Sequence, residues 1–243
     1  MIELLKKIEA LKEIYDISEF EWKIPRSCPL PIPEKRASSF QKNVYLKKNL
    51  KSIISDDKTL STHYWVIQDW GGIGSFKKNE RNDKRIVKFL EELKDGKLTK
   101  ANFDAISSLS KVASFMHPEE YVIYDSRVIY GLNWLLFNFS DSKKLFPQPV
   151  GRSAALSKYD MQTIFRLSGK HYEYYSHKEA FHEYCKLIKQ LSSDKTAPYL
   201  LEMFIFAIAP SWVVQDIQET VSLKISHAHN KSKHADAVSC AGV

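Results

Sequence analysis

Apolar residues recur at intervals of three and four along most of this chain, which is the spacing of one face of an α-helix. The start of the chain is typical, since Leu4, Ile8 and Leu11 would share one helical face. The apolar and polar alternation of half-buried strands is scarce. Periodicity therefore predicts an all-α fold, and 243 residues suit one large domain or two small helical lobes that share a core.

The same periodicity gives the expected order of helices along the chain. Helices are predicted over 1–16, 34–54, 58–70, 80–94, 99–116, from 126 onward, and over 158–168, 176–192 and 197–209. Prolines make 24–33 an extended segment, and 140–153 has the composition of a loop. We expect residues 1–225 to form one helical domain. The tail 226–243 has almost no large apolar residue, so we expect it to be disordered.

Charge and cysteine content narrow the classes of partner. A formal charge of +7 and a pI near 9.1 favour an acidic partner such as DNA. The charged start argues against a signal peptide, and no run of about 18 apolar residues suggests a membrane span. Three dispersed cysteines without a CxxC pair suggest neither disulfides nor a metal site. The prediction is a monomeric, cytoplasmic protein with no membrane partner, metal or cofactor.

The stretch from Ser107 to Val128 carries the strongest chemical signal. Lys111 is expected to open a helix that stops at His117-Pro118, and an apolar run then leads to Asp125, which opens the next helix. Either residue has a structural explanation, because an aspartate at a helix start caps backbone amides and a lysine is ordinarily a solvated surface residue. Capping and catalysis are compatible roles for Asp125.

This stretch resembles the DNA glycosylases of the helix-hairpin-helix (HhH-GPD) superfamily, which include the 8-oxoguanine enzymes. Lys111-Val112-Ala113 and Asp125-Ser126-Arg127-Val128 are similar to the two anchors of that family, a lysine that ends a hairpin and an aspartate that begins a helix. The glycine-rich turn expected before the lysine is replaced by Ser107-Ser108-Leu109-Ser110. Serines keep amide contacts to phosphate in principle and add hydroxyl donors.

The resemblance implies two helical lobes around a cleft and an enzyme that breaks the N-glycosidic bond of a base flipped out of double-stranded DNA. Asp125 would stabilise the positive charge that develops on the sugar. Lys111 would attack C1′ and form a Schiff base, permitting strand cleavage, and this needs a neutral amine whose pKa desolvation lowers. Without the amine, water attacks and an abasic site remains.

A base pocket is predicted from the aromatics and amides that precede the glycine run at 71–74, with the loop histidine as a further candidate. The predicted pocket residues are Trp65, Gln68, Asp69, Trp70 and His117. Core packing is the alternative for both tryptophans. Since the two tryptophans are five residues apart, they do not share a helical face, so at least one of them can face a cleft.

A surface that contacts the DNA backbone is predicted from basic residues at helical spacing and from hydroxyls near the two anchors. Its predicted members are Ser107, Ser108, Ser110, Arg127, Lys77, Lys78, Arg81, Lys84, Arg85 and Arg152. A solvated helix face and a surface turn are the alternatives for the basic residues.

The substrate is open at this stage. The resemblance implies 8-oxoguanine as the default and therefore a repair enzyme. The altered hairpin favours a specialised base, and because prokaryotic relatives remove modified bases from phage DNA, glucosylated hydroxymethylcytosine and antiviral defence are the second hypothesis. A DNA-binding module without catalysis is a third. A metal-dependent nuclease is disfavoured, because no cluster of acidic residues has suitable spacing.

Overall fold

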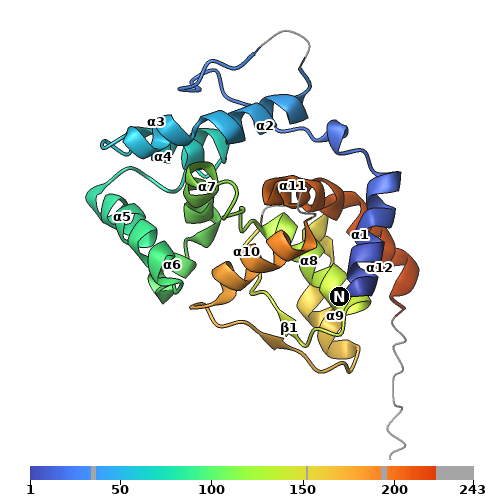
Figure 1. Cartoon of the computed structure of the whole chain (residues 1–243). Helices are drawn as coiled ribbons and strands as arrows, with labels where there is room; N and C mark the ends of the chain where they lie inside the picture. Colours follow the sequence, from blue (N-terminus) through green and yellow to red (C-terminus); the bar gives the residue numbers. More distant parts are fainter. Residues whose placement is uncertain (34–36, 152, 193–195, 223–243) are drawn as a thin grey trace, which may run out of the picture.

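A computed structural model describes residues 1–33, 37–151, 153–192 and 196–222 (Figure 1). Helix accounts for 62% of the structure and strand for 2%, which confirms the all-α prediction. The predicted tail 226–243 and the predicted phosphate contact Arg152 lie outside the described residues.

The first half of the chain follows the predicted order with finer divisions. Its elements are α1 (Ile2–Ile14), η1 (Ile17–Glu19), α2 (Ser39–Asn49), α3 (Lys51–Asp56), α4 (Ser61–Trp65), the π-helical turn η2 (Val66–Trp70), α5 (Glu80–Asp95), α6 (Lys100–Phe103) and α7 (Ile106–Met116). The helix predicted over 34–54 is divided at Leu50 into α2 and α3. Residues 24–33 are neither helix nor strand, as predicted from their prolines.

The second half contains two features that periodicity did not predict. Its elements are α8 (Ser126–Phe139), β1 (Lys144–Leu145), η3 (Leu156–Lys158), α9 (Met161–Leu167), β2 (Glu173–Tyr174), α10 (Ala180–Leu191), α11 (Pro198–Ile208), the π-helical turn η4 (Ala209–Val213) and α12 (Val214–Thr220). The strands pair in parallel over two residues each, too short for any alternation to register. The last predicted helix also continues past 209 through η4 and α12.

Helix α8 lies at the centre of the second half, where it packs against α1, α11 and η4 (Figure 1). Its residues from Val128 to Leu136 are buried on every side, which is the pattern of a core helix rather than of a surface helix. Gly131 permits the close contact with α11, because a Cβ there would lie only 2.9 Å from Cγ2 of Ile205. Asp125, immediately before α8, is thus attached to a helix of the core.

The stretch Pro198–Thr220 corrects the expectation that no segment is apolar enough to span a membrane. Its 23 residues reach a mean hydropathy of 1.5 over an 18-residue window, so length and composition alone would allow a span. In the fold, 56% of that window is buried, and α11 packs against α8 and α10. The stretch therefore has the packing of a core helix.

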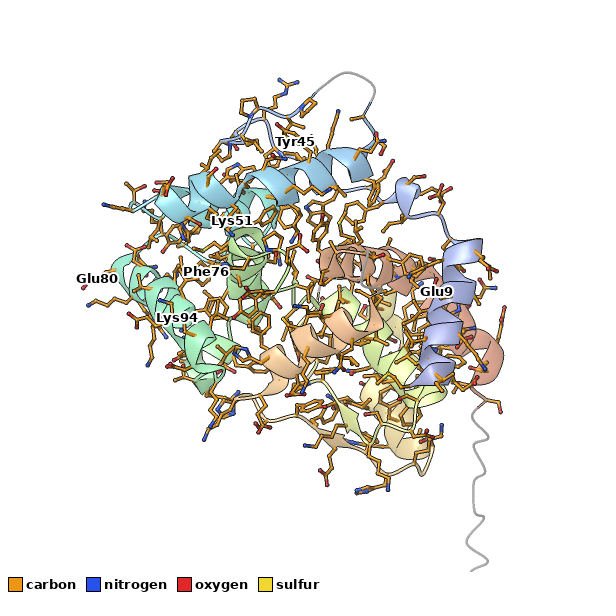
Figure 2. The ribbon with its side chains drawn as sticks, viewed as in Figure 1. Glu9, Tyr45, Lys51, Phe76, Glu80 and Lys94 are labelled. Carbon is orange, nitrogen blue, oxygen red and sulfur yellow. The ribbon has the colours of Figure 1, made fainter. Side chains whose placement is uncertain are left out.

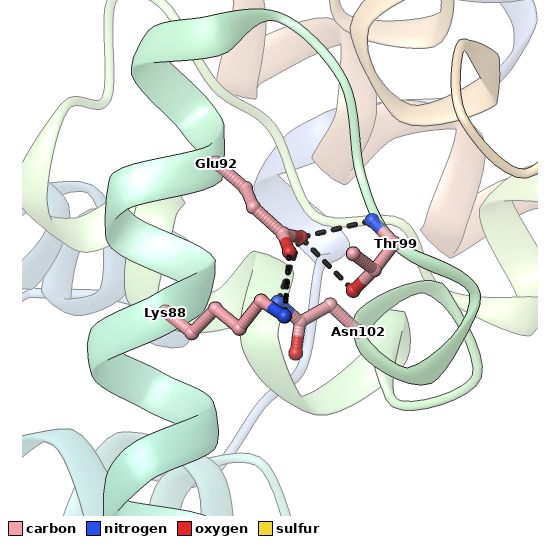
Figure 3. A network of polar contacts seen from close by, with 4 residues as sticks. All are labelled: Lys88, Glu92, Thr99 and Asn102. Atoms are coloured by element: carbon pink, nitrogen blue, oxygen red, sulfur yellow. Dashed lines mark hydrogen bonds and ion pairs between the residues drawn. The ribbon is translucent and has the colours of Figure 1, made fainter.

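A polar network joins α5 to α6 and determines where α7 begins (Figure 3). The carboxylate of Glu92 accepts hydrogen bonds from the backbone N–H of Thr99 at 2.9 Å and from the Asn102 amide at 2.8 Å, and Lys88 lies 3.8 Å from its other oxygen. These contacts hold the start of α6 against α5. The turn at Asp104 and Ala105 then leads directly into α7.

Candidate active site

The segment that contains Lys111 differs from the predicted hairpin. Residues 107–110 lie within the first turns of α7, and Lys111 occupies the middle of that helix instead of its start. The turn before the helix falls at Asp104 and Ala105. Serine is tolerated in a helix when its hydroxyl has a partner, and the buried Ser110 hydroxyl accepts the backbone N–H of Tyr124 at 3.0 Å. The predicted serine turn is therefore wrong.

Asp125 ends an extended segment that several hydrogen bonds hold in place. Besides the bond from Tyr124 to α7, the hydroxyl of Tyr184 in α10 donates to the carbonyl of Ile123 at 2.8 Å. Asp125 is the N-cap of α8, and its Oδ1 accepts the N–H of Arg127 at 2.8 Å. The capping role expected for Asp125 is confirmed. The cap bond uses one of the two carboxylate oxygens.

Lys111 and Asp125 line the same pocket, between α2, η2 and α7 on one side and α11 on the other. The residues that line it are Phe20, Trp22, Asn43, Lys47, Trp70, Gly71, Lys111, Ile123, Asp125, Glu202, Met203 and Phe206. The cavity volume is about 40 Å³, room for a few water molecules. The lining includes two amines and two carboxylates. Such groups are costly to bury, so a buried pocket that retains four of them is a candidate for chemistry.

The aromatic walls of the pocket are fixed by hydrogen bonds to their polar edges. The indole N–H of Trp22 donates to the carbonyl of Trp70 at 2.9 Å, and the indole N–H of Trp70 donates to Asn43 Oδ1 at 3.0 Å. The Asn43 amide in turn donates to the carbonyl of Trp22 at 2.8 Å. The Trp22 ring meets Phe206 edge to face, with 5.4 Å between centroids. The walls are thus held ready to contact a flat ligand.

Lys47 and Glu202 form the most deeply buried charged part of the pocket, with side chains 1% and 3% exposed. Burial lowers the pKa of Lys47 to about 8, an effect that Glu202 opposes and Lys111 reinforces. Burial raises the pKa of Glu202 to about 7, an effect that Lys47 opposes. The Lys47 amine donates to the hydroxyl of Ser114 in α7 and lies 4.4 Å from the centroid of Phe115. Among the described residues, Glu202 Oε2 has no hydrogen-bond partner.

The raised pKa of Glu202 predicts a pH-dependent stability term. Between its ordinary pKa of 4.5 and its folded pKa of about 7, the native state binds the proton more tightly than the unfolded state does. The contribution of Glu202 to the free energy of unfolding therefore falls as pH rises through this range, by about 3 kcal/mol in all. Glu202→Gln should lack this dependence. Urea unfolding of both proteins across the range measures it, and parallel curves would contradict it.

Gly71 is needed because the Lys111 side chain passes directly over it. A Cβ at Gly71 would lie 2.6 Å from Cδ of Lys111 and 2.7 Å from the carbonyl oxygen of Ile67. The backbone of Gly71 has φ −80°, which any residue can adopt, so space is the constraint. The first glycine of the run at 71–74 thus lets the lysine stem pass beside η2 on its way into the pocket.

Gly71→Ala is therefore expected to destabilise the fold by about 1–3 kcal/mol and to displace the amine of Lys111. Gly74→Ala is the matched control, since a Cβ there meets no atom within 4 Å, and this change should be neutral or slightly stabilising. Urea unfolding measures both variants. Equal stability of the two would show that the lysine stem adjusts without cost.

A wider mouth opens from this pocket toward the surface. The two cavities share Trp22, Gly71, Lys111, Asp125 and Phe206, and the mouth adds about 110 Å³. Hydroxyls and a cation line its outer part. These outer residues are Ser107, Ser126, Arg127 and Ser153. The guanidinium of Arg127 lies 4.8 Å from the centroid of Phe206. The amine of Lys111 and the carboxylate of Asp125 therefore stand where the inner pocket and the mouth meet.

Comparisons with protein-family models, curated proteins and solved structures found no match for this chain. The site is therefore interpreted from its own residues. Within the described part of the chain, no three His, Cys, Asp or Glu side chains are grouped as a metal ion would require.

Of the five predicted pocket residues, only Trp70 lines the inner cavity. The indole N–H of Trp65 donates to Ser27, and the amide of Gln68 donates to the carbonyl of Phe76. Asp69 is exposed on η2. His117 contacts Tyr121 beyond the end of α7. Trp65 and Trp70 point in different directions, as their spacing indicated.

The predicted backbone-contacting residues divide into three groups. Ser107 and Arg127 line the mouth, whereas Ser108 and Ser110 are buried and support the fold instead. The basic residues before and within α5 are exposed or half-buried and lie apart from the mouth lining. These are Lys77, Lys78, Arg81, Lys84 and Arg85.

The basic face of α5 is less positive than its lysines and arginines suggested. Acidic residues alternate with the basic ones along the helix, and Lys84 pairs with Glu80 at 2.6 Å. Glu80 and Lys94 extend from opposite ends of α5 in Figure 2. Lys78 donates to the carbonyl of Thr59 at 3.0 Å. This face is explained by ordinary solvation.

Several pocket residues were not predicted as site residues from the sequence. They are Phe20, Trp22, Asn43, Lys47, Gly71, Ile123, Glu202, Met203 and Phe206. Glu202 stands in an otherwise apolar run, and a lone carboxylate in such a run is a sequence signal for a buried polar group. Lys47 lies in a lysine-rich helix, where no sequence signal distinguishes a buried lysine from its solvated neighbours. Trp22 lies between two predicted elements and carries no periodicity.

Proposed function

We propose that this protein is a DNA glycosylase that takes a flipped base into the inner pocket and cleaves its N-glycosidic bond with Asp125 and Lys111. The observation that carries the proposal is that these two residues, predicted from a short resemblance, line one buried pocket with aromatic walls. The spacing of Lys111 and Asp125 in the sequence did not by itself require their side chains to lie close together. A pocket of this kind suits a flat base, and its mouth suits the sugar and phosphate.

Two further observations support DNA as the partner. Val150, at the mouth, is 98% exposed, and an exposed apolar side chain beside such a site suits insertion between stacked bases. Arg127, Ser107 and Ser126 at the mouth offer donors to phosphate oxygens. The net charge of +7 adds a general attraction to DNA. In this proposal, the helices on the two sides of the pocket act as the two lobes around a cleft.

In the proposed reaction, the bond between C1′ of the sugar and the base nitrogen breaks. The base leaves with the bonding electron pair and takes up a proton. The neutral amine of Lys111 forms a new bond to C1′ and loses a proton, and opening of the sugar ring gives a Schiff base. Asp125 stabilises the positive charge at the sugar during bond cleavage. If water attacks in place of the amine, an abasic site remains.

The test is to incubate the protein with duplexes that carry 8-oxoguanine, uracil, alkylated bases, hydroxymethylcytosine or its glucosylated form. Alkali-labile cleavage on a denaturing gel would establish the activity and identify the base. Preference for glucosylated phage DNA over unmodified DNA would support antiviral defence, and preference for 8-oxoguanine would support repair. Binding to DNA without base release from any duplex would overturn the proposal in favour of a binding module.

A further inference from the structure

The deepest part of the inner pocket contains polar groups that the proposed bond cleavage does not use. Asp125 and Lys111 also line the mouth, whereas Lys47, Glu202 and Asn43 line the inner pocket alone. Asn43 is engaged with both tryptophans, as described above. Lys47 and Glu202 are therefore the polar groups that remain for contact with a base held between the aromatic walls.

Glu202 offers a hydrogen-bond acceptor without a protein partner. The carboxyl receives a backbone hydrogen bond from Ile123, and its Oε2 is buried with no partner in the described part of the chain. A buried carboxylate oxygen that has lost bulk water and has no protein partner is costly. A ligand with an N–H group would remove that cost.

Lys47 offers the complementary donor. Its ammonium has three N–H groups, and the Ser114 hydroxyl accepts one of them. Its side chain is held beside Phe115 and Trp70, with the amine 4.4 Å and 5.8 Å from the two ring centroids. The inner pocket thus presents an acceptor from α11 and a donor from α2.

We propose that Glu202 and Lys47 select a base that carries an exocyclic amino group next to a ring acceptor, as cytosine and its 5-substituted forms do. The proposal rests on the proposed function and specifies its substrate class. The amino group would donate to Glu202, a pairing also used in the reading of cytosine N4 in DNA grooves, and Lys47 would donate to N3 or O2. A single ring needs less widening of the inner cavity of about 40 Å³ than a purine does, which favours a pyrimidine.

Uracil is the sharpest comparison, because it has the shape of cytosine with a carbonyl in place of the amino group. Its O4 would face the Glu202 carboxylate, acceptor against acceptor, and its N3–H would face the Lys47 donor. Each mismatch leaves buried groups unpaired, which is how polar sites reject near-isosteric ligands. We expect binding of cytosine to exceed that of uracil by about 10- to 100-fold.

Glu202→Gln should remove most of this preference. If the glutamine oxygen keeps the contact with Ile123, its amide nitrogen faces the base and can only donate, so it pairs with O4 of uracil instead of N4 of cytosine. We expect the ratio of cytosine to uracil affinity to fall by about 10-fold or more. Glu92→Gln is the matched control, because Glu92 is also buried but lies in the α5–α6 network of Figure 3.

The experiment titrates free cytosine, uracil and their 5-hydroxymethyl forms into the full chain and follows tryptophan fluorescence. Trp22 and Trp70 line the pocket and report its occupancy. The pH is set between about 7 and 8, where Glu202 is ionised and Lys47 is protonated, with Lys111 and Asp125 also close to Glu202. Binding of the amino bases in preference to their 4-oxo counterparts, lost in Glu202→Gln and kept in Glu92→Gln, supports the inference.

Equal binding of both base types, binding to none of them, or an unchanged ratio in Glu202→Gln would overturn the inference. This readout needs no catalysis, so its failure is separate from that of the proposed function. Selective binding without base release from DNA would support base selection by Glu202 and Lys47 and would contradict the proposed glycosylase activity. Base release from DNA without selective binding would support the glycosylase activity and contradict the base selection.

Discussion

Asp125→Asn is expected to lower the rate of base release by about 10²- to 10³-fold while leaving DNA affinity and the fold unchanged. Asparagine keeps the acceptor oxygen that receives the N–H of Arg127, and it caps helices as well as aspartate does. The substitution therefore removes the negative charge beside the sugar and little else. Single-turnover excision, with DNA binding and urea unfolding in parallel, measures the effect.

Asp160→Asn provides the control for this experiment. Asp160 is the N-cap of α9, where it accepts the N–H of Gln162 at 3.2 Å, and it does not line the inner pocket or the mouth. The same chemical change at this cap should leave excision at the wild-type rate. If Asp125→Asn also kept the wild-type rate, Asp125 would be only a cap, and the catalytic assignment would fall.

Lys111→Gln is expected to abolish the covalent adduct that borohydride traps between protein and DNA, and to slow base release by about 10³-fold or more. The Lys111 side chain is buried, and its amine donates to the carbonyl of Ser107 at 2.6 Å, one turn earlier in α7. That bond holds the amine near the mouth, where C1′ of a flipped nucleotide would stand. Denaturing gels with and without borohydride measure the adduct.

Lys47→Gln distinguishes the two lysines that line the inner pocket. If Lys111 is the nucleophile, the adduct persists in Lys47→Gln, whatever happens to base preference. Loss of the adduct in Lys47→Gln alone would assign the amine to Lys47 and leave Lys111 as a neighbouring charge. Base release with no adduct in the wild type would point to attack by water and would remove the lyase step from the mechanism.

Local patterns were sufficient for the helices and for the cap of α8. Apolar spacing reports which face of a segment is buried, and this depends on residues only three or four apart. A proline-rich run and an aspartate at a helix start also act on residues close to them in the sequence. The extended segment at 24–33 and the cap at Asp125 were therefore predicted correctly. The serine turn predicted before Lys111 is wrong because it followed the family pattern. Serine can also continue a helix, and here it does.

Only the tertiary structure decided which side chains share the pocket. Lys47 on α2 and Glu202 on α11 line one pocket although their helices are far apart in the sequence, and no periodic signal encodes that they do so. Burial then changes their chemistry, since the same lysine and glutamate in water would keep their ordinary pKa values. The sequence by itself determined the helices and the cap at Asp125, and packing determined which charged groups share the pocket with Lys111 and Asp125.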